Sequence, residues 1–311
     1  MSDVWHTHTT PLMGTTLNLA GGAAHLSESQ VRERFAAVVD DLQALAAVWT
    51  RFDPASDLEQ LNASRQESVR VDPRLGRAVA AALACRRRSR GLVDPALGDA
   101  IADVGYDETI STLDRVDPVD VARLVARRPC RPAQPRRRCA PVAVSPDLRT
   151  VIRRPGVRLD LGGTAKGLAV DIGMRRLRDL DRWTIDLGGD VRVGGARRDL
   201  RQEVLVAGPV DGATVACLAI DRGAVATSAI TRRAWRGRDG EIAHHLLDPS
   251  AGRSAWTGLL QVTARARTAL EAELLAKVAL LRGPQAGVDV LRGRHGGVLV
   301  HADGTVQEVH A

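Results

Sequence analysis

Residues 158–171 read Arg-Leu-Asp-Leu-Gly-Gly-Thr-Ala-Lys-Gly-Leu-Ala-Val-Asp, and the rest of the chain is organised around them. Apolar and charged residues alternate over 157–161, which predicts a strand. The pair Gly162-Gly163 then allows a sharp turn that can approach a ligand closely. Apolar residues at helical spacing predict a helix from Gly167 to about Leu180. A strand, a glycine turn and a helix start present backbone N–H groups to an anion, although such turns also occur for packing alone.

Lysine usage singles out two positions. The chain contains 44 lysines and arginines, and only Lys166 and Lys277 are lysines. A sequence so biased toward arginine should keep lysine where a compact ammonium is needed, because a planar guanidinium cannot replace it. Lys166 lies in the glycine turn, so we expect it to serve a ligand. Chance retention is the alternative for each lysine.

The composition predicts a single globular domain over residues 1–311, with 44% hydrophobic residues to fill a core. The formal charge is +7, but the arginines are scattered, and the one dense cluster, Arg136 to Arg138, falls in a Pro/Arg-rich stretch over 108–141 that we expect to be an irregular loop region. Aromatic residues make up 3% of the chain, too few for base-stacking platforms. We therefore expect no nucleic-acid partner.

The cysteines and the N-terminus exclude further classes. None of the four cysteines forms a CxxC pair, which argues against a zinc site or a redox dithiol. The first ten residues lack the basic and apolar regions of a signal peptide, and no lipid-anchor motif is present. No apolar segment is long enough to cross a bilayer. We expect a cytoplasmic protein without membrane insertion.

Strands and helices alternate irregularly along the chain. The pattern predicts helices after a capping box at Ser27, after Asp72-Pro73 and over 268–281. Strands are expected over 13–20, 183–187, 203–207 and 215–220, a small-residue turn over 224–229, and a hairpin over 298–309. This order lacks the regular rhythm of a doubly wound sheet, so we predict an α+β fold.

Two polar pairs and one aspartate have both a functional and a structural interpretation. His245 precedes Asp248 by three residues, and such a pair is more often a structural hydrogen bond than a catalytic one. Glu273 and Lys277 are spaced as an exposed helical salt bridge, but their neighbours are apolar, which favours a functional role. Asp94, just before a proline, is either a helix cap or a ligand contact.

Taken together, these segments resemble the FAD:protein FMN transferase family, also called the ApbE family. The resemblance runs in order from Met13 to about Gly283. The segments that carry it are 13–15, 52–62, 93–95, 160–171, 186–190, 226–228, 245–249 and 272–273.

The resemblance implies a T-fold-like α+β protein with mixed sheets, packed helices and an FAD cleft between subdomains. Its members transfer FMN from FAD to a threonine or serine hydroxyl of a target flavoprotein and release AMP. By position, His245 would be the general base. The residues that would bind FAD are Met13, Phe52, Leu92, Val93, Asp94, Asp160, Lys166, Thr227 and Leu247.

The resemblance also implies Mg²⁺, held by the Gly163 carbonyl and a helical carboxylate at Glu273. The family usually carries aspartate there and threonine four residues later, whereas this chain has Glu273 and Lys277. A protonated lysine cannot bind a cation. Lys277 therefore either closes the metal site, leaving a non-catalytic FAD-binding protein, or takes over part of the work of the metal in catalysis. An FAD pyrophosphatase, which would use water as the acceptor, is a further alternative.

Overall fold

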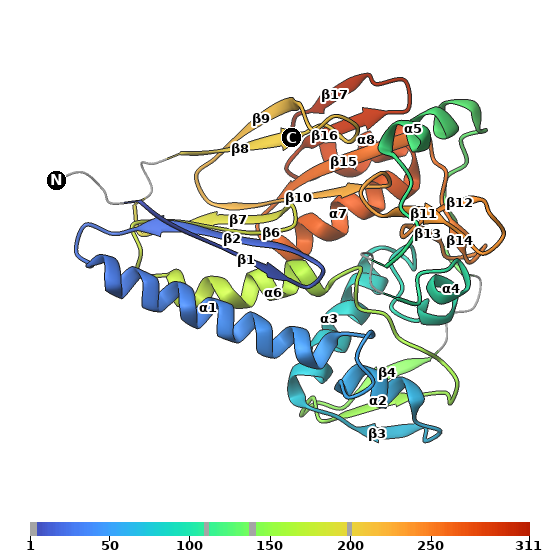
Figure 1. Cartoon of the computed structure of the whole chain (residues 1–311), viewed down its shortest axis with the longest axis horizontal. Helices are drawn as coiled ribbons and strands as arrows, with labels where there is room; N and C mark the ends of the chain where they lie inside the picture. The colour runs from blue at the N-terminus through green and yellow to red at the C-terminus, as the bar shows by residue number, and fades with distance from the viewer. Residues whose placement is uncertain (1–4, 109–111, 137–140, 198–200) are drawn as a thin grey trace.

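The computed structural model describes residues 5–108, 112–136, 141–197 and 201–311 (Figure 1). Arg137, Arg138 and Cys139, which enter the expectations above, lie outside these ranges. An eight-stranded sheet dominates the fold, with the order β1-β2-β6-β7-β10-β15-β16-β17 and antiparallel pairing throughout. Its strands are β1 His6–Leu12, β2 Thr15–Gly22, β6 Arg182–Leu187, β7 Asp190–Gly194, β10 Gly223–Ala229, β15 Leu259–Ala266, β16 Gly297–His301 and β17 Val306–Val309.

The helices and the smaller strands surround this main sheet. The helical segments are α1 Glu28–Trp49, α2 Asp57–Ala63, α3 Pro73–Arg88, α4 Gly98–Asp103, α5 Pro118–Arg127, α6 Ala165–Gly173, η1 Met174–Leu177, α7 Ala269–Arg282 and α8 Pro284–Arg292. The remaining strands are β3 Ser68–Arg70, β4 Val142–Val144, β5 Thr150–Arg153, β8 Gln202–Ala207, β9 Thr214–Ile220, β11 Ala234–Arg236, β12 Ile242–His244, β13 Leu247–Asp248 and β14 Arg253–Ser254. The α+β class is confirmed.

The two faces of the main sheet are covered differently. Helices α1, α6 and α7 lie on one face, and the β8–β9 hairpin lies on the other (Figure 1). The second face packs as its own apolar cluster, in which Val191 and Val193 of β7 meet Val206 and Leu218 of the hairpin. Strand alternation then turns Asp190 and Arg192 of β7 toward the helices.

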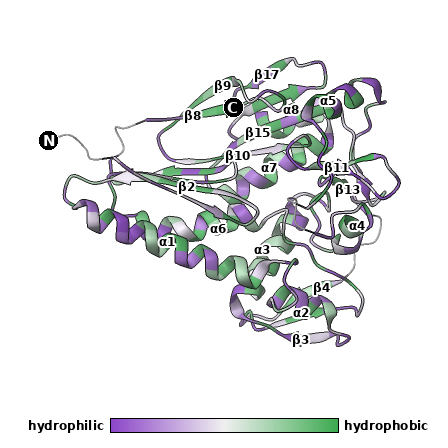
Figure 2. Ribbon diagram, in the orientation of Figure 1, coloured by the Kyte–Doolittle hydropathy of each residue, from purple (hydrophilic) through white to green (hydrophobic). Residues whose placement is uncertain are grey.

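Helix α1 shows why these helices form where they do. Ser27 caps it in a capping box with Gln30, as the sequence predicts. Its buried residues, including Phe35 and Leu42, recur at helical spacing, and hydrophilic and hydrophobic turns alternate along it in Figure 2. Burial of that stripe, more than intrinsic propensity, stabilises a helix of this kind.

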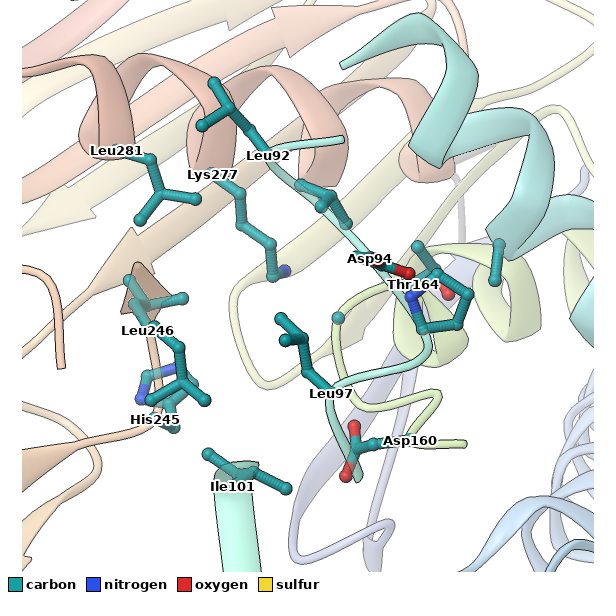
Figure 3. A pocket seen from close by; sticks show the side chains of 15 residues that line it. Leu92, Asp94, Leu97, Ile101, Asp160, Thr164, His245, Leu246, Lys277 and Leu281 are labelled. Atoms are coloured by element: carbon teal, nitrogen blue, oxygen red, sulfur yellow. The ribbon is translucent and has the colours of Figure 1, made fainter. Parts of the chain in front are cut away.

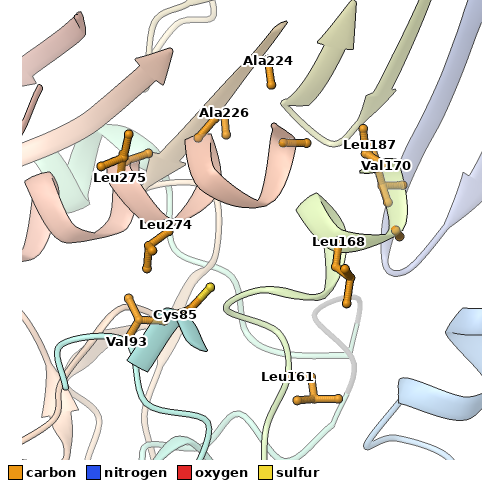
Figure 4. Packing of buried hydrophobic residues seen from close by; sticks show 14 of the residues in the cluster. Cys85, Val93, Leu161, Leu168, Val170, Leu187, Ala224, Ala226, Leu274 and Leu275 are labelled. Atoms are coloured by element: carbon orange, nitrogen blue, oxygen red, sulfur yellow. The ribbon is translucent and has the colours of Figure 1, made fainter. Parts of the chain in front are cut away.

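Helices α6 and α7 cross very closely beneath the main sheet. Leu168 and Val170 of α6 and Leu274 and Leu275 of α7 belong to the same buried cluster (Figure 4). A Cβ atom added to Gly167 would lie 2.8 Å from both the Ala269 carbonyl oxygen and the Leu270 Cα atom. Only glycine therefore permits this crossing, which places the first turn of α6 against α7.

Asp171 joins the same two helices. Its carboxylate accepts hydrogen bonds from the N–H groups of Ala269 and Leu270, at 2.9 and 3.1 Å, and forms an ion pair with Arg192 of β7. Thr268 caps the next N–H group of α7, that of Glu271. The start of α7 is thus bound to α6 and to the main sheet.

Two local expectations are wrong. Residues 157–161 form no strand, because their backbone groups bond elsewhere: the Asp160 N–H donates to the Pro95 carbonyl at 2.8 Å, and the Leu159 N–H to Asn62 Oδ1 at 2.8 Å. Residues 224–229 are not a turn but strand β10, and their small side chains let α7 pack directly on the sheet.

The stretch over 108–141 also differs from the expected irregular loop, because it contains helix α5; residues 109–111 and 137–140 within it lie outside the described part. Asp117 caps α5 and Pro118 occupies its first position, where proline is favoured. No helix in the described residues is long and apolar enough to cross a membrane.

Gly167→Ala should destabilise the protein. Alanine would favour the helix by about 1 kcal/mol, but its Cβ would press on the backbone of α7, and overpacking of this kind costs about 1–3 kcal/mol. We expect a net loss, measured as a lower melting temperature. Gly293→Ala is the control, because Gly293 has an ordinary φ of −72° and a nearest contact of 3.4 Å. Equal melting temperatures for the two variants would contradict the proposed role of Gly167.

Candidate active site

Three adjoining cavities open where α6, α7 and the loops before and after them meet. The largest two share Lys166, Arg233, His245 and Lys277 in their common wall. The second, smaller cavity shares Asp160, Gly163, His245 and Lys277 with the first (Figure 3). The structure thus brings together on these walls all the site residues predicted from the sequence except Glu273, which lies directly behind them.

The first cavity has a volume of about 460 Å³ and an aromatic lining. Met13, Trp49, Phe52 and Tyr106 line it, and Phe52 and Tyr106 meet edge to face with ring centroids 5.7 Å apart. The Arg51 guanidinium lies 4.3 Å from the centre of the Phe52 ring and pairs with Asp160 at 2.7 Å. This aromatic cavity suits a large planar ring.

The second, smaller cavity has a mostly apolar lining at the end away from the residues that it shares with the first. Leu92, Val93 and Leu247 line it there together with Asp94. Asp94 Oδ1 accepts a hydrogen bond from the Ala96 N–H at 3.0 Å, whereas Oδ2 is buried without a partner in the described structure. A buried acceptor without a donor is costly, so Oδ2 is suited to receive a donor from a ligand. In Figure 3, Asp94 lies on the wall opposite His245.

The third cavity is polar and lies beneath β8. Thr227 lines it with Arg232, Arg233 and the glycine pair Gly188-Gly189. Both glycines have positive φ, 62° and 90°, so the turn after β6 needs them. Thr227 bonds to the Thr263 hydroxyl at 2.9 Å, which fixes its side chain. This polar cavity is open to a partner that reaches the lysines from the side away from the aromatic cavity.

Both lysines of the chain meet at Glu273. Lys277 Nζ donates to Glu273 Oε1 at 2.9 Å, and Lys166 Nζ lies 3.4 Å from the same oxygen and also pairs with Asp190. Glu273 Oε2 accepts the Gly167 N–H at 3.0 Å. The close crossing of α6 and α7 thereby assembles a buried cluster of alternating charges, Asp190–Lys166–Glu273–Lys277.

Burial and charge oppose each other in this cluster. Burial alone would lower the pKa of Lys166, but the carboxylates of Asp190 and Glu273 raise it above its ordinary value. Burial likewise favours protonated Glu273, but the Lys277 and Lys166 ammonium groups hold its pKa below the usual range. Burial raises the pKa of Asp190 to about 6 despite the ammonium of Lys166. Lys166 is therefore a cation at neutral pH.

The donor set at Glu273 does not fit Mg²⁺. Both carboxylate oxygens accept N–H donors, and the Lys277 ammonium lies against one of them. Mg²⁺ requires near-octahedral oxygen ligands at about 2.0–2.1 Å. Among the described residues, no group of three or more histidine, cysteine, aspartate or glutamate side chains can hold a metal ion.

The neighbouring histidines His244 and His245 differ in their environment: His244 is buried in the core, whereas His245 lines the cavities. His244 is fully buried: Nδ1 accepts the Leu246 N–H, Nε2 donates to the Ala255 carbonyl, and the ring meets Trp256 edge to face. His245 lines all three cavities, and its Nδ1 faces the Arg233 carbonyl at 3.4 Å. A carbonyl can only accept, so Nδ1 carries the proton and Nε2 is the basic nitrogen.

The electrostatics keep His245 neutral. Burial first, and then the positive charge of Arg233, hold the pKa of His245 well below its ordinary value. The alternative interpretation of His245 is a structural hydrogen bond to Asp248. In the structure, Asp248 instead accepts hydrogen bonds from the N–H and the hydroxyl of Ser250, both at 2.8 Å. His245 is therefore available as a base at neutral pH.

Sequence reasoning missed Arg233 of the common wall and Asp190 of the charged cluster behind it. Asp190 follows the sequence Asp-Leu-Gly-Gly at 186–189, which repeats the Asp-Leu-Gly-Gly at 160–163 before Lys166, and this repeat could have singled it out. Arg233 carried no such signal in a chain so rich in arginine.

The chain is similar to known proteins over most of its length. The model of the ApbE family matches residues 13–301. Over 238 residues, or 73% of this chain, the sequence is 29% identical to the FAD:protein FMN transferase of Rhodobacter capsulatus, of which the match covers 42%. It is also 29% identical to the protein of the same name from Treponema pallidum, with 76% of this chain and 68% of that protein covered. The chain thus spans less than half the length of the Rhodobacter relative.

Solved structures show the same fold. The ApbE protein of Thermotoga maritima superposes with a TM-score of 0.79 at 22% identity, covering 98% of this chain and 97% of that one. The flavin transferase ApbE of Vibrio cholerae superposes with a TM-score of 0.73 at 20% identity, covering 99% and 97%.

His244 should make the stability depend on pH. Burial lowers the pKa of His244 to about 3, whereas an unfolded histidine titrates near 6.5, so between these values the unfolded chain binds more protons. Stability therefore falls as the pH falls below about 6.5. Between about pH 7 and pH 5 we expect the protein to lose about 2 kcal/mol more than His244→Gln does. Denaturant titrations of both proteins would measure this, and parallel losses would contradict it.

Proposed function

The chain belongs to the ApbE family, and from this premise we propose that it is an FAD:protein FMN transferase. It would move FMN from FAD to a serine or threonine hydroxyl of a target flavoprotein and release AMP. One observation carries the proposal. The base His245 and the cations Lys166, Lys277 and Arg233 lie in a wall shared by an aromatic cavity and a polar cavity. A flavin donor and a protein acceptor can therefore reach the same groups from two sides.

The linings of the cavities support a placement for each part of FAD. The flavin ring fits the aromatic cavity, against Met13 and Phe52, because large planar rings bury most surface against such side chains. We place the adenine end of FAD at the smaller cavity, where Asp94 Oδ2 would receive a donor from it; the cavity has a volume of about 90 Å³ and would have to widen on binding. The pyrophosphate then lies between them, beside Asp160, Gly163 and Lys277, which line both cavities.

Phosphoryl transfer needs positioning, charge neutralisation and a base. The acceptor hydroxyl enters through the polar cavity beside Thr227 and gives its proton to His245 Nε2. Its oxygen bonds to the FMN-side phosphorus, and the bond from that phosphorus to the oxygen of AMP breaks. AMP leaves with the electron pair.

The protein should bind FAD more tightly than FMN, because FMN leaves the smaller cavity empty. Asp94→Asn should weaken FAD binding by about 10-fold or more while FMN binding stays within about 2-fold, since a charged acceptor contributes about 1.5–3 kcal/mol. Flavin fluorescence titrations would measure both affinities. The amide retains an oxygen for the Ala96 N–H, so the loop stays capped. Equal affinities of the unmodified protein for the two flavins would overturn the assignment of the smaller cavity.

His245→Ala should keep FAD affinity within a few-fold and slow flavin transfer by about 10²–10⁴-fold, the usual size of a general-base contribution. The measurement is covalent flavin on a target flavoprotein, followed alongside AMP release. His8→Ala is the matched control, because His8 is exposed on β1. Loss of FAD binding in His245→Ala, or unchanged turnover, would show that this histidine is structural. AMP release without flavin transfer to the target would identify a pyrophosphatase instead.

A further inference from the structure

We propose, on the basis of the flavin transferase function above, that Lys277 and Lys166 replace a divalent metal and make the reaction metal-independent. The resemblance to the ApbE family implies Mg²⁺ between the Gly163 carbonyl and the carboxylate at Glu273, and the donor set does not fit that ion. The two ammonium groups supply the positive charge that the pyrophosphate requires.

The Lys277 side chain lies in the space where a metal would have to bind. A Cβ atom added to Gly163 would be 3.9 Å from Lys277 Cε, and Lys277 Nζ is 2.9 Å from Glu273 Oε1. The arm of Lys277 thus runs from beside Gly163 to Glu273, and Figure 3 shows it entering the smaller cavity from α7. An ion bound by the same two groups would collide with this side chain.

Both carboxylate oxygens of Glu273 already accept hydrogen bonds from nitrogen donors. Its Oε2 accepts the Gly167 N–H at 3.0 Å, and its Oε1 faces both ammonium groups. A dication beside two ammonium groups would be repelled by each, and burial makes that repulsion stronger than in water. The carboxylate therefore acts as the counter-ion that holds the two lysines in place.

The ammonium of Lys277 retains donors for a ligand. An ammonium has three N–H donors, and the bond to Glu273 uses one of them. Lys277 lines all three cavities, and Lys166 lines the two larger ones. Both lysines of a chain that otherwise uses arginine lie in this wall. A lysine ammonium is a compact point charge on a flexible stem, so it occupies less space beside Glu273 and a pyrophosphate than a planar guanidinium would.

In the transfer step the ammonium groups act on the leaving group. As the acceptor oxygen bonds to the FMN-side phosphorus, negative charge grows on the oxygen that departs with AMP. The hydroxyl proton goes to His245, and AMP leaves as its phosphate anion, so charges and atoms balance. Preorganised cations near that oxygen stabilise the transition state without capture and dehydration of an ion.

The test compares FAD binding and AMP release in excess EDTA and in excess MgCl2, with a target flavoprotein present. For the unmodified protein we expect both quantities to agree within about 2-fold between the two conditions. Lys277→Met should weaken FAD binding by about 10–100-fold, as loss of a charged hydrogen bond does, and MgCl2 should not restore it. Arg65→Met removes one exposed charge elsewhere and serves as the control.

A double variant tests whether dependence on Mg²⁺ can be introduced. Lys277→Thr with Glu273→Asp replaces the ammonium by oxygen donors of the kind Mg²⁺ prefers, so its AMP release should require MgCl2. Binding of inorganic pyrophosphate by calorimetry gives a readout independent of turnover, and it should follow the same pattern. The melting temperature of each variant shows whether it is folded. If Lys277→Met does not fold, Lys277→Arg tests the need for a compact ammonium, with weaker pyrophosphate binding expected.

The outcomes separate this proposal from the function on which it rests. An unmodified protein that is silent in EDTA and active in MgCl2 overturns the replacement of the metal but keeps the transferase. FAD binding without AMP release in either condition overturns both and leaves a flavin-binding protein. Absence of FAD binding in both conditions overturns the proposed function itself.

Discussion

The contact of α6 with α7 at Gly167 is the constraint on which the site depends. Because Gly167 has no side chain, the backbone of α6 lies against Ala269 and Leu270, and its N–H donates to Glu273 at 3.0 Å. Asp171, one helical turn later, binds the start of α7. The same crossing that closes the core therefore carries Lys166 to Glu273.

Burial then sets the chemistry of the cluster. Opposite charges in a site of low polarity interact strongly, and each would be costly if it were unpaired. Lys166 accordingly lies between Asp190 and Glu273, and Glu273 between Lys166 and Lys277. This alternation fixes the position of both ammonium groups before a ligand arrives. The ligand is thus met by charges that need no rearrangement.

The alternation of side chains along β7 of the main sheet also positions residues of the site. In β7, alternation sends Asp190 and Arg192 toward α6 and sends Val191 and Val193 toward the β8–β9 hairpin. Residues of β8 line the polar cavity and residues of α1 line the aromatic cavity, so different elements surround the shared wall on its two sides. A donor and an acceptor can meet at the shared wall without competing for one entrance.

The sequence by itself determined the α+β class and the long helices, and it singled out most of the residues discussed here that line the candidate site. Capping at Ser27, apolar spacing in α1 and the glycine pair before Lys166 depend on local chemistry that a sequence displays. Only the tertiary structure decided that residues 157–161 are not a strand and that 224–229 are one, because pairing depends on which neighbours are available. It also decided that Arg233 and Asp190 join the site, and that Lys277 lies between Gly163 and Glu273. These contacts join residues far apart in the chain, and sequence spacing carries no information about such distances.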